Sequence, residues 1–241
     1  MFLTVRQELL KIAEEDYKKF SGSLIPGEER ILGIRIPKLR EMAKSIAKEN
    51  WEEYLDEYEQ YRQRGKKEGM TEQGSYFEED MLFGMVIGYA KMGMEERMRQ
   101  LQRFLPLISN WSVCDCCCTT YKFMKKDQKQ WYEFLKEQLT SGEEFRIRFA
   151  LVAFLGHFVN EEYVERILKD CEAMKHPGYY AKMAAAWAVS VCFVKFPEKT
   201  EEFLKDNQMD DWVQNKSIQK IRESYRVQKE KKEELLTYKR K

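Results

Sequence analysis

Apolar side chains recur along this chain with the spacing of α-helices. Residues 2–20 place them three or four positions apart, which predicts a helical start, followed by a loop from Ser21 to Arg30. Pro37 suits the first residue of a further helix because its missing amide hydrogen is not needed there, and Trp51 begins another. The polar stretch from Arg62 to Gly74 predicts an exposed loop.

Two kinds of helix are predicted to alternate beyond this loop. Apolar helices rich in small residues start about 34 residues apart, near Phe77, Trp111, Phe145 and Tyr180. More charged helices lie between them, at 95–105, 128–139, 161–174 and 199–205. A helical pair repeating at this period is typical of a solenoid whose stacked repeats bury one continuous core. Because the tetratricopeptide and ankyrin patterns are missing, we predict an all-α, HEAT-like helical-repeat solenoid.

In such a solenoid one helix of each pair lines the concave wall, and corresponding positions stack along it. Trp111, Arg148 and Trp187 are about one repeat apart, so we expect them to line one concave groove. The last predicted helix adds Lys216 and Lys220, four residues apart, as a stripe of positive charge.

The composition predicts a single domain with no global attraction to polyanions. Its 241 residues carry 42 Lys and Arg against 41 Asp and Glu, so a nucleic-acid site has to be a local basic patch. We expect residues 1–241 to form one domain, with a charged, fraying helical tail over 226–241.

The cysteines and the termini of the chain indicate its compartment. Four of the six cysteines fall between positions 114 and 118, where one helix can neither pair neighbours comfortably nor close four ligands around zinc. We therefore expect packing cysteines, and neither metal nor cofactor. The stretch Met1 to Leu10 lacks a signal-peptide core, and no apolar run is long enough to span a membrane. These features predict a soluble, cytoplasmic protein, which we expect to be a monomer.

The most informative stretch starts at Ser109 and Asn110, either of which can cap a helix. Trp111 and Asp115 follow, four residues apart and therefore on one face. An aromatic π-face beside a carboxylate suits a cationic ligand. The alternative is structural, with Trp111 as a core anchor and Asp115 as a solvated helix residue.

The order and spacing of these motifs resemble the AlkD-type DNA alkylation repair family, HEAT-like glycosylases that act on alkylated purines. The resemblance covers most of the chain, through segments 24–26, 32–44, 110–115, 146–150, 179–188 and 216–224. The catalytic pattern of the family is a tryptophan, an aspartate four residues later, an arginine one repeat on and a second tryptophan. These positions match Trp111, Asp115, Arg148 and Trp187.

The resemblance implies hydrolysis of the N-glycosidic bond of N7-alkylguanine or N3-alkyladenine in duplex DNA, without flipping of the base. The positive charge makes such a base a good leaving group, and Asp115 would stabilise the charge that develops on the deoxyribose. Trp111 and Trp187 would pack on the sugar and backbone, and Arg148 would grip a phosphate. Lys182, Lys216 and Lys220 are further DNA-binding candidates.

Each assignment has a plainer alternative. Arg148 can pair with Glu144 on its own helix, and Trp187, among alanines, can be buried at a helix crossing. The segment from Ser75 to Glu79 departs from the His-Glu-Glu start of many relatives. The alternative function is a non-catalytic HEAT-like DNA-binding or scaffold paralogue. Asp115 favours the enzyme, because a scaffold needs no carboxylate among phosphate-binding residues.

Overall fold

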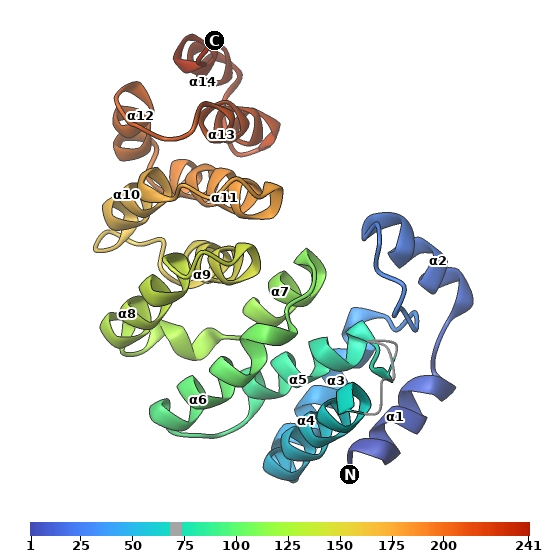
Figure 1. The fold of residues 1–241 in the computed structure, drawn as a ribbon. Helices are drawn as coiled ribbons and strands as arrows, with labels where there is room; N and C mark the ends of the chain where they lie inside the picture. Colours follow the sequence, from blue (N-terminus) through green and yellow to red (C-terminus); the bar gives the residue numbers. More distant parts are fainter. Residues whose placement is uncertain (68–73) are drawn as a thin grey trace. The chain divides into compact units, whose positions relative to one another are not determined.

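The computed structural model describes residues 1–67 and 74–241, which form helices and connecting loops (Figure 1). The described residues contain no strand, so the all-α prediction is confirmed. Contacts between Cα atoms divide the chain into two compact units, Met1–Tyr121 (unit 1) and Lys122–Lys241 (unit 2). That all 241 residues form a single solenoid domain stays a prediction.

Unit 1 is organised around one buried helix, α5, which packs against α3, α6 and α7. Its sequence is apolar nearly all round, as expected of a helix surrounded by others. Gly84 permits this packing, because a Cβ atom there would lie 2.5 Å from the Phe104 ring and 2.6 Å from the Cys117 Sγ. The helices are α1 (Phe2–Lys11), α2 (Glu15–Leu24), α3 (Ile36–Lys48), α4 (Trp51–Lys67), α5 (Phe77–Tyr89), α6 (Met94–Phe104), η2 (Leu105–Leu107) and α7 (Trp111–Cys118).

The amino-terminal helical region differs from the prediction. It is divided into α1 and α2, because the Glu14 amide leaves the helical pattern and donates to the carbonyl of Gly33 at 3.1 Å. Gly33 has a φ of +91°, and a Cβ atom there would lie 2.4 Å from the Glu14 carbonyl oxygen. The predicted loop also starts later than Ser21, since α2 continues to Leu24 and ends just before Pro26.

The predicted polar loop is partly helical. α4 continues as far as Lys67, while residues 68–73 lie outside the described part of the chain. The Tyr61 hydroxyl donates to the carbonyl of Gly74 at 2.8 Å, and Arg62 pairs with buried Asp80. These tertiary partners explain why so polar a stretch belongs to a helix.

Unit 2 is organised around α11, which packs against α9, α10, α12 and α13. Figure 1 shows α9, α11 and α13 as successive neighbours. The predicted alternation of apolar and charged helices is confirmed in both units. The helices of unit 2 are η3 (Lys122–Lys125), α8 (Gln128–Leu139), α9 (Glu144–His157), α10 (Val164–Ala173), α11 (Tyr179–Lys195), α12 (Pro197–Lys205), α13 (Asp211–Glu223), α14 (Lys229–Glu234) and η4 (Leu235–Tyr238).

The carboxyl-terminal tail is anchored to unit 2 instead of fraying. Leu235 is fully buried, and the Gln214 side-chain amide donates to the carbonyl of Tyr238 at 3.0 Å. Arg240 donates to the carbonyl of Met209 and forms an ion pair with Asp211 at 3.1 Å. Contacts with residues about 30 positions away thus order a stretch whose local composition favours solvent.

Candidate functional site

α7 presents two polar or aromatic side chains on its partly exposed face. Asn110 caps the helix: its side-chain oxygen accepts from the amides of Ser112 at 3.0 Å and Val113 at 3.1 Å. Trp111 and Asp115 are half-buried, whereas most other residues of this helix are buried. The ring and the carboxylate therefore lie one turn apart on one accessible face, as predicted from their spacing.

A charged network fixes the start of α7 to a distant loop. Glu28 accepts from the Asn110 side-chain amide at 3.1 Å and from the Ser109 hydroxyl at 3.2 Å. Arg30 joins the same carboxylate at 3.0 Å and reaches Asp80 of α5 at 3.1 Å. The pKa of Glu28 is lowered although burial opposes this, because Arg30 and Asn110 donate hydrogen bonds to the carboxylate.

Two further contacts position the exposed face of α7. The indole nitrogen of Trp111 donates to the carbonyl of Leu24 at 3.3 Å, so the end of α2 fixes the orientation of the ring. Arg40 of α3 donates to the Thr119 hydroxyl at 3.1 Å, at the other end of the helix. Arg40 is half-buried, and its position beside the helix of Asp115 makes it a candidate that sequence reasoning missed. No local pattern marked it, because the contact spans 79 residues.

Three consecutive acidic residues at the start of α5 are buried. The Glu78 carboxylate accepts from the amides of Leu32 at 3.0 Å and Gly33 at 2.7 Å, and so holds that segment against the helix. Burial raises the pKa of Glu79 to about 7, only partly offset by the Tyr76 amide and Arg6. Burial likewise raises the pKa of Asp80, against the effect of its arginine partners. This trio supports the framework beneath α7.

Unit 2 brings together two residues predicted for the site, Trp187 and Lys220. Both line a pocket of about 330 Å³ between α11 and α13, together with Lys195 and Arg226. Trp187 is half-buried, while its alanine neighbours are fully buried and allow the close approach of adjacent helices. The lining also includes the carboxylate of Glu223, so three cations face one anion. An aromatic ring beside an excess of cations suits a sugar-phosphate backbone.

Arg148 lies deeper than the sequence suggested. Its side chain is 5% exposed, and it donates to the carbonyl of Tyr180 at 3.0 Å. Its guanidinium also lies 5.9 Å from the centre of the Tyr180 ring. Glu144 accepts from the Tyr180 amide at 2.6 Å, so two residues of α9 bind the backbone at the start of α11.

Aromatic rings at the starts of α9, α11 and α13 form a chain of contacts, which we call the aromatic row. Ring centres are 5.3 Å apart for Phe145 and Tyr180, 5.4 Å for Tyr180 and Tyr179, and 5.8 Å for Tyr179 and Trp212. Lys216 lies 5.6 Å from the centre of the Trp212 ring. Sequence reasoning missed the row, although an aromatic residue within the first two positions of each helix was a usable signal.

The remaining predicted cation, Lys182, is paired. Its ammonium lies 2.9 Å from Asp210, whose carboxylate also caps α13 by accepting from the Trp212 amide at 3.0 Å. Lys182 thus links α11 to α13, and only part of its charge is available to a ligand.

Comparison with known families decides the class of protein. The sequence model of the family described as DNA alkylation repair enzyme matches residues 5–221. The chain belongs to this family. Searches among curated proteins and among solved structures gave no match.

Membership of the DNA alkylation repair family confirms the resemblance found in the sequence, and makes the chain a repair enzyme that binds DNA. The matched region contains all seven predicted site residues: Trp111, Asp115, Arg148, Lys182, Trp187, Lys216 and Lys220. Trp111 and Asp115 belong to unit 1 and the other five to unit 2. Their convergence on one groove, and their individual roles, stay predictions.

The cysteines of α7 serve the core of this repair enzyme. Cys114, Cys117 and Cys118 are buried, and the Cys117 thiol donates to the carbonyl of Met81 at 3.2 Å. Within residues 1–67 and 74–241, no group of three or more His, Cys, Asp or Glu side chains is arranged to hold a metal ion. No helix of this described part has the length and apolar character needed to cross a bilayer.

Proposed function

We propose that this DNA alkylation repair enzyme is a glycosylase that hydrolyses the N-glycosidic bond of cationic alkylated purines, such as N7-alkylguanine and N3-alkyladenine, in duplex DNA. The observation that carries the proposal is the half-buried pair of Trp111 and Asp115 on one accessible face of α7. A positively charged nucleoside can meet a π-face and a carboxylate at once there.

The chemistry follows from the charge of the substrate. When the bond between C1′ and the base nitrogen breaks, its electron pair neutralises the cationic base, which therefore leaves without a strong general acid. Positive charge develops on the deoxyribose, and a fixed carboxylate at Asp115 stabilises it. Water then adds to C1′ and releases one proton. Trp111, whose indole nitrogen is fixed by the carbonyl of Leu24, would pack on the sugar.

Unit 2 supplies the groups proposed to bind the DNA backbone. The pocket of Trp187 and Lys220 and the aromatic row with Lys216 combine ring faces with positive charge. Arg148 keeps the phosphate-binding role that the family pattern implies. Because it is 5% exposed beside Tyr180, contact with a phosphate would require neighbouring side chains to move. We further propose that the enzyme acts in the cytoplasm as a monomer.

The test is single-turnover release of free N7-methylguanine from methylated duplex DNA, measured beside equilibrium binding to the same duplex. Release of the base supports the glycosylase. Binding without release would favour the non-catalytic DNA-binding paralogue, and absence of both would contradict the proposed site altogether.

A further inference from the structure

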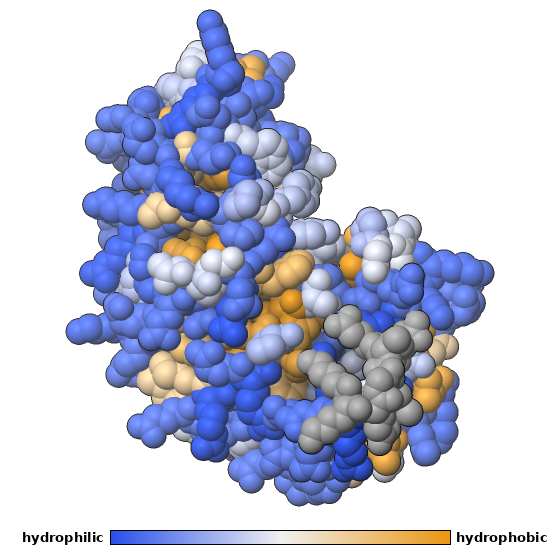
Figure 2. Space-filling model, viewed as in Figure 1, coloured by the Kyte–Doolittle hydropathy of each residue, from blue (hydrophilic) through white to orange (hydrophobic). Residues whose placement is uncertain are grey.

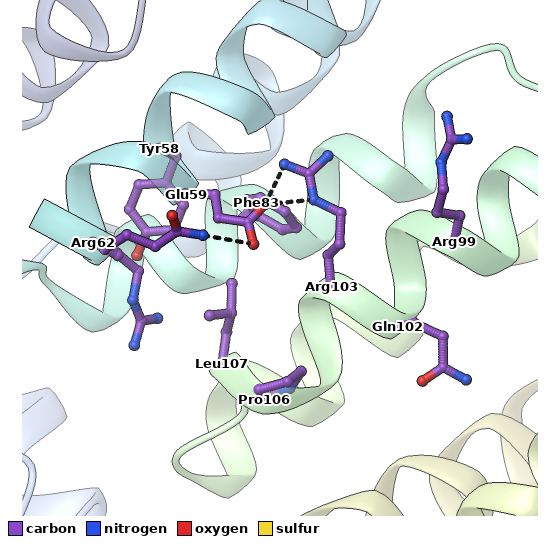
Figure 3. A pocket seen from close by; sticks show the side chains of 10 residues that line it. Tyr58, Glu59, Arg62, Phe83, Arg99, Gln102, Arg103, Pro106 and Leu107 are labelled. Atoms are coloured by element: carbon purple, nitrogen blue, oxygen red, sulfur yellow. Dashed lines mark hydrogen bonds and ion pairs between the residues drawn. The ribbon is translucent and has the colours of Figure 1, made fainter. Parts of the chain in front are cut away.

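Unit 1 contains a second candidate binding site, separate from the residues of α7 discussed above. A pocket of about 520 Å³ lies between α4 and α6, with η2 along one side (Figure 3). This volume falls within the range of about 300–1,000 Å³ typical of small-molecule sites. Neither Trp111 nor Asp115 is among its lining residues, so the proposed base excision does not account for it.

The base of the pocket is apolar. Tyr58 of α4 and Phe83 of α5 are buried, with ring centres 5.7 Å apart, and Pro106 and Leu107 continue the apolar surface towards solvent. Figure 2 shows that the surface on this side of the molecule is mostly hydrophilic, with several separate hydrophobic areas. Because Tyr58 is 0% and Phe83 is 1% exposed, the apolar surface open to a ligand comes from Pro106 and Leu107, above the two rings. Such a surface favours a ligand with a flat apolar body, such as an aromatic ring.

The walls of the pocket carry three guanidinium groups. Arg62, Arg99 and Arg103 line it, against the single carboxylate of Glu59. Arg103 neutralises Glu59, its Nε donating at 2.7 Å, and Figure 3 shows the two side chains pointing towards each other. Each of the three arginines has a carboxylate partner: Arg62 pairs with Asp80, Arg99 with Glu96, and Arg103 also with Asp56 at 2.8 Å. What the walls offer a ligand is therefore the set of guanidinium N–H donors that these pairs leave unused.

Arg62 is the arginine best placed to meet an anion. One of its terminal nitrogens pairs with buried Asp80, which fixes the guanidinium, and its side chain is 19% exposed. Among the described residues, its Nε and second terminal nitrogen have no hydrogen-bond partner. A planar guanidinium held at one end presents its remaining donors to a carboxylate, sulfonate or phosphate. Arg99, with a side chain 71% exposed, adds charge at the rim.

From this combination of an apolar lining and a fixed guanidinium with unused donors, we propose that the pocket between α4 and α6 binds a small aromatic anion. The aromatic body packs on Pro106 and Leu107, over the buried rings of Tyr58 and Phe83, and the charged group meets the free edge of Arg62. The proposal is independent of the excision chemistry, because it uses neither the reacting groups nor the DNA-binding residues assigned above.

The test uses two probes of one shape. The anionic probe is 8-anilinonaphthalene-1-sulfonate, and the neutral probe is N-phenyl-1-naphthylamine, which lacks only the sulfonate. Fluorescence titration of the full chain should show saturable binding of the anionic probe at one site per chain. We expect the neutral probe to bind about tenfold more weakly, the effect of roughly one charge-assisted hydrogen bond. Binding at many sites, or equal affinity for both probes, would overturn the proposal.

Charge-altering variants locate the site. Arg62→Gln removes the proposed contact and should weaken binding of the anionic probe, but it also removes a partner of buried Asp80. Arg99→Glu therefore serves as the second variant, because within the described part of the chain Arg99 pairs only with Glu96 on its own helix. Arg99→Glu should lower the affinity for the anionic probe about tenfold and leave the affinity for the neutral probe unchanged. Its matched control is Arg64→Glu, an exposed position on α4 outside the pocket lining. Equal effects of the two variants, or displacement of the probe by duplex DNA, would reject a dedicated small-anion site.

Discussion

The side-chain amide of Asn110 donates to Glu28 at 3.1 Å across 82 residues of sequence, while its oxygen caps the helix that carries Trp111 and Asp115. One side chain thus caps the start of a helix and also forms a tertiary hydrogen bond. The direction in which the exposed face of α7 points is thereby fixed by the loop before α3.

This relationship predicts a graded effect of substitution at Asn110. Asn110→Ala removes the cap and the bond to Glu28, and should lower the free energy of unfolding by about 1–2 kcal/mol. Asn110→Ser keeps a capping oxygen and should lower the free energy of unfolding by less. The measurement is urea unfolding of both variants beside the wild type. Equal losses for alanine and serine would show that the cap contributes little.

Charge at Asp115 is predicted to control excision more than binding. Asp115→Asn keeps the shape of the side chain but removes its negative charge, so excision should fall by a factor on the order of 10²–10³. Affinity for duplex DNA should stay constant or rise, because a carboxylate near phosphates repels them. Single-turnover base release and equilibrium binding measure the two effects separately. A variant that excises at the wild-type rate would remove Asp115 from the mechanism.

Lys216 and Lys220 are predicted to contact DNA phosphates. Substitution of either by Gln should reduce the slope of log affinity against log salt concentration by about one unit. Lys169→Gln on α10, an exposed lysine outside the predicted site, is the matched control and should leave the slope unchanged. Binding isotherms at several salt concentrations provide the slopes. The assignment fails if the control changes the slope as much as the two site variants.

Burial of Glu79 predicts a specific pH dependence of stability. Its pKa of about 7 in the folded state exceeds the ordinary 4.5, so the folded protein binds this proton more tightly than the unfolded chain does. The resulting stabilisation is fully present below the unfolded pKa of 4.5 and is lost as the pH rises through the folded pKa of about 7. It amounts to at most about 3 kcal/mol.

Glu79→Gln should remove this contribution. The free energy of unfolding of the wild type should therefore fall relative to that of the variant between about pH 4.5 and 8. Chemical unfolding across this range tests the effect, with Glu52→Gln, an exposed carboxylate of α4, as control. Parallel pH profiles for wild type and Glu79→Gln would contradict the prediction.

Local sequence signals placed most of the helices correctly. The starts of α5, α7 and α11 were predicted correctly from apolar periodicity. A helix that buries a face carries apolar residues three or four positions apart, and this spacing is visible in the sequence. Asn110 was recognisable as a cap because the capping bond joins residues two and three positions apart. The family also followed from motif order, since the order of segments is a property of the chain itself.

Departures from the prediction occur where distant residues compete with local preference. The division between α1 and α2 depends on the bond from Glu14 to Gly33, and the extension of α4 on partners such as Asp80. The tail is ordered by contacts such as the one between Gln214 and Tyr238. None of these partners is adjacent in sequence, so periodicity and composition could not reveal them.

The sequence by itself determined the all-α class, the alternation of helices, the family and the residues proposed for the chemistry, because each depends on the identity and spacing of nearby residues. Only the tertiary structure decided that Arg148 is buried and donates to the carbonyl of Tyr180, and that Trp187 and Lys220 line one pocket. The same holds for the contacts between aromatic rings of three helices. These features arise when helices pack, because side chains far apart in the chain then compete for the same space and the same hydrogen bonds.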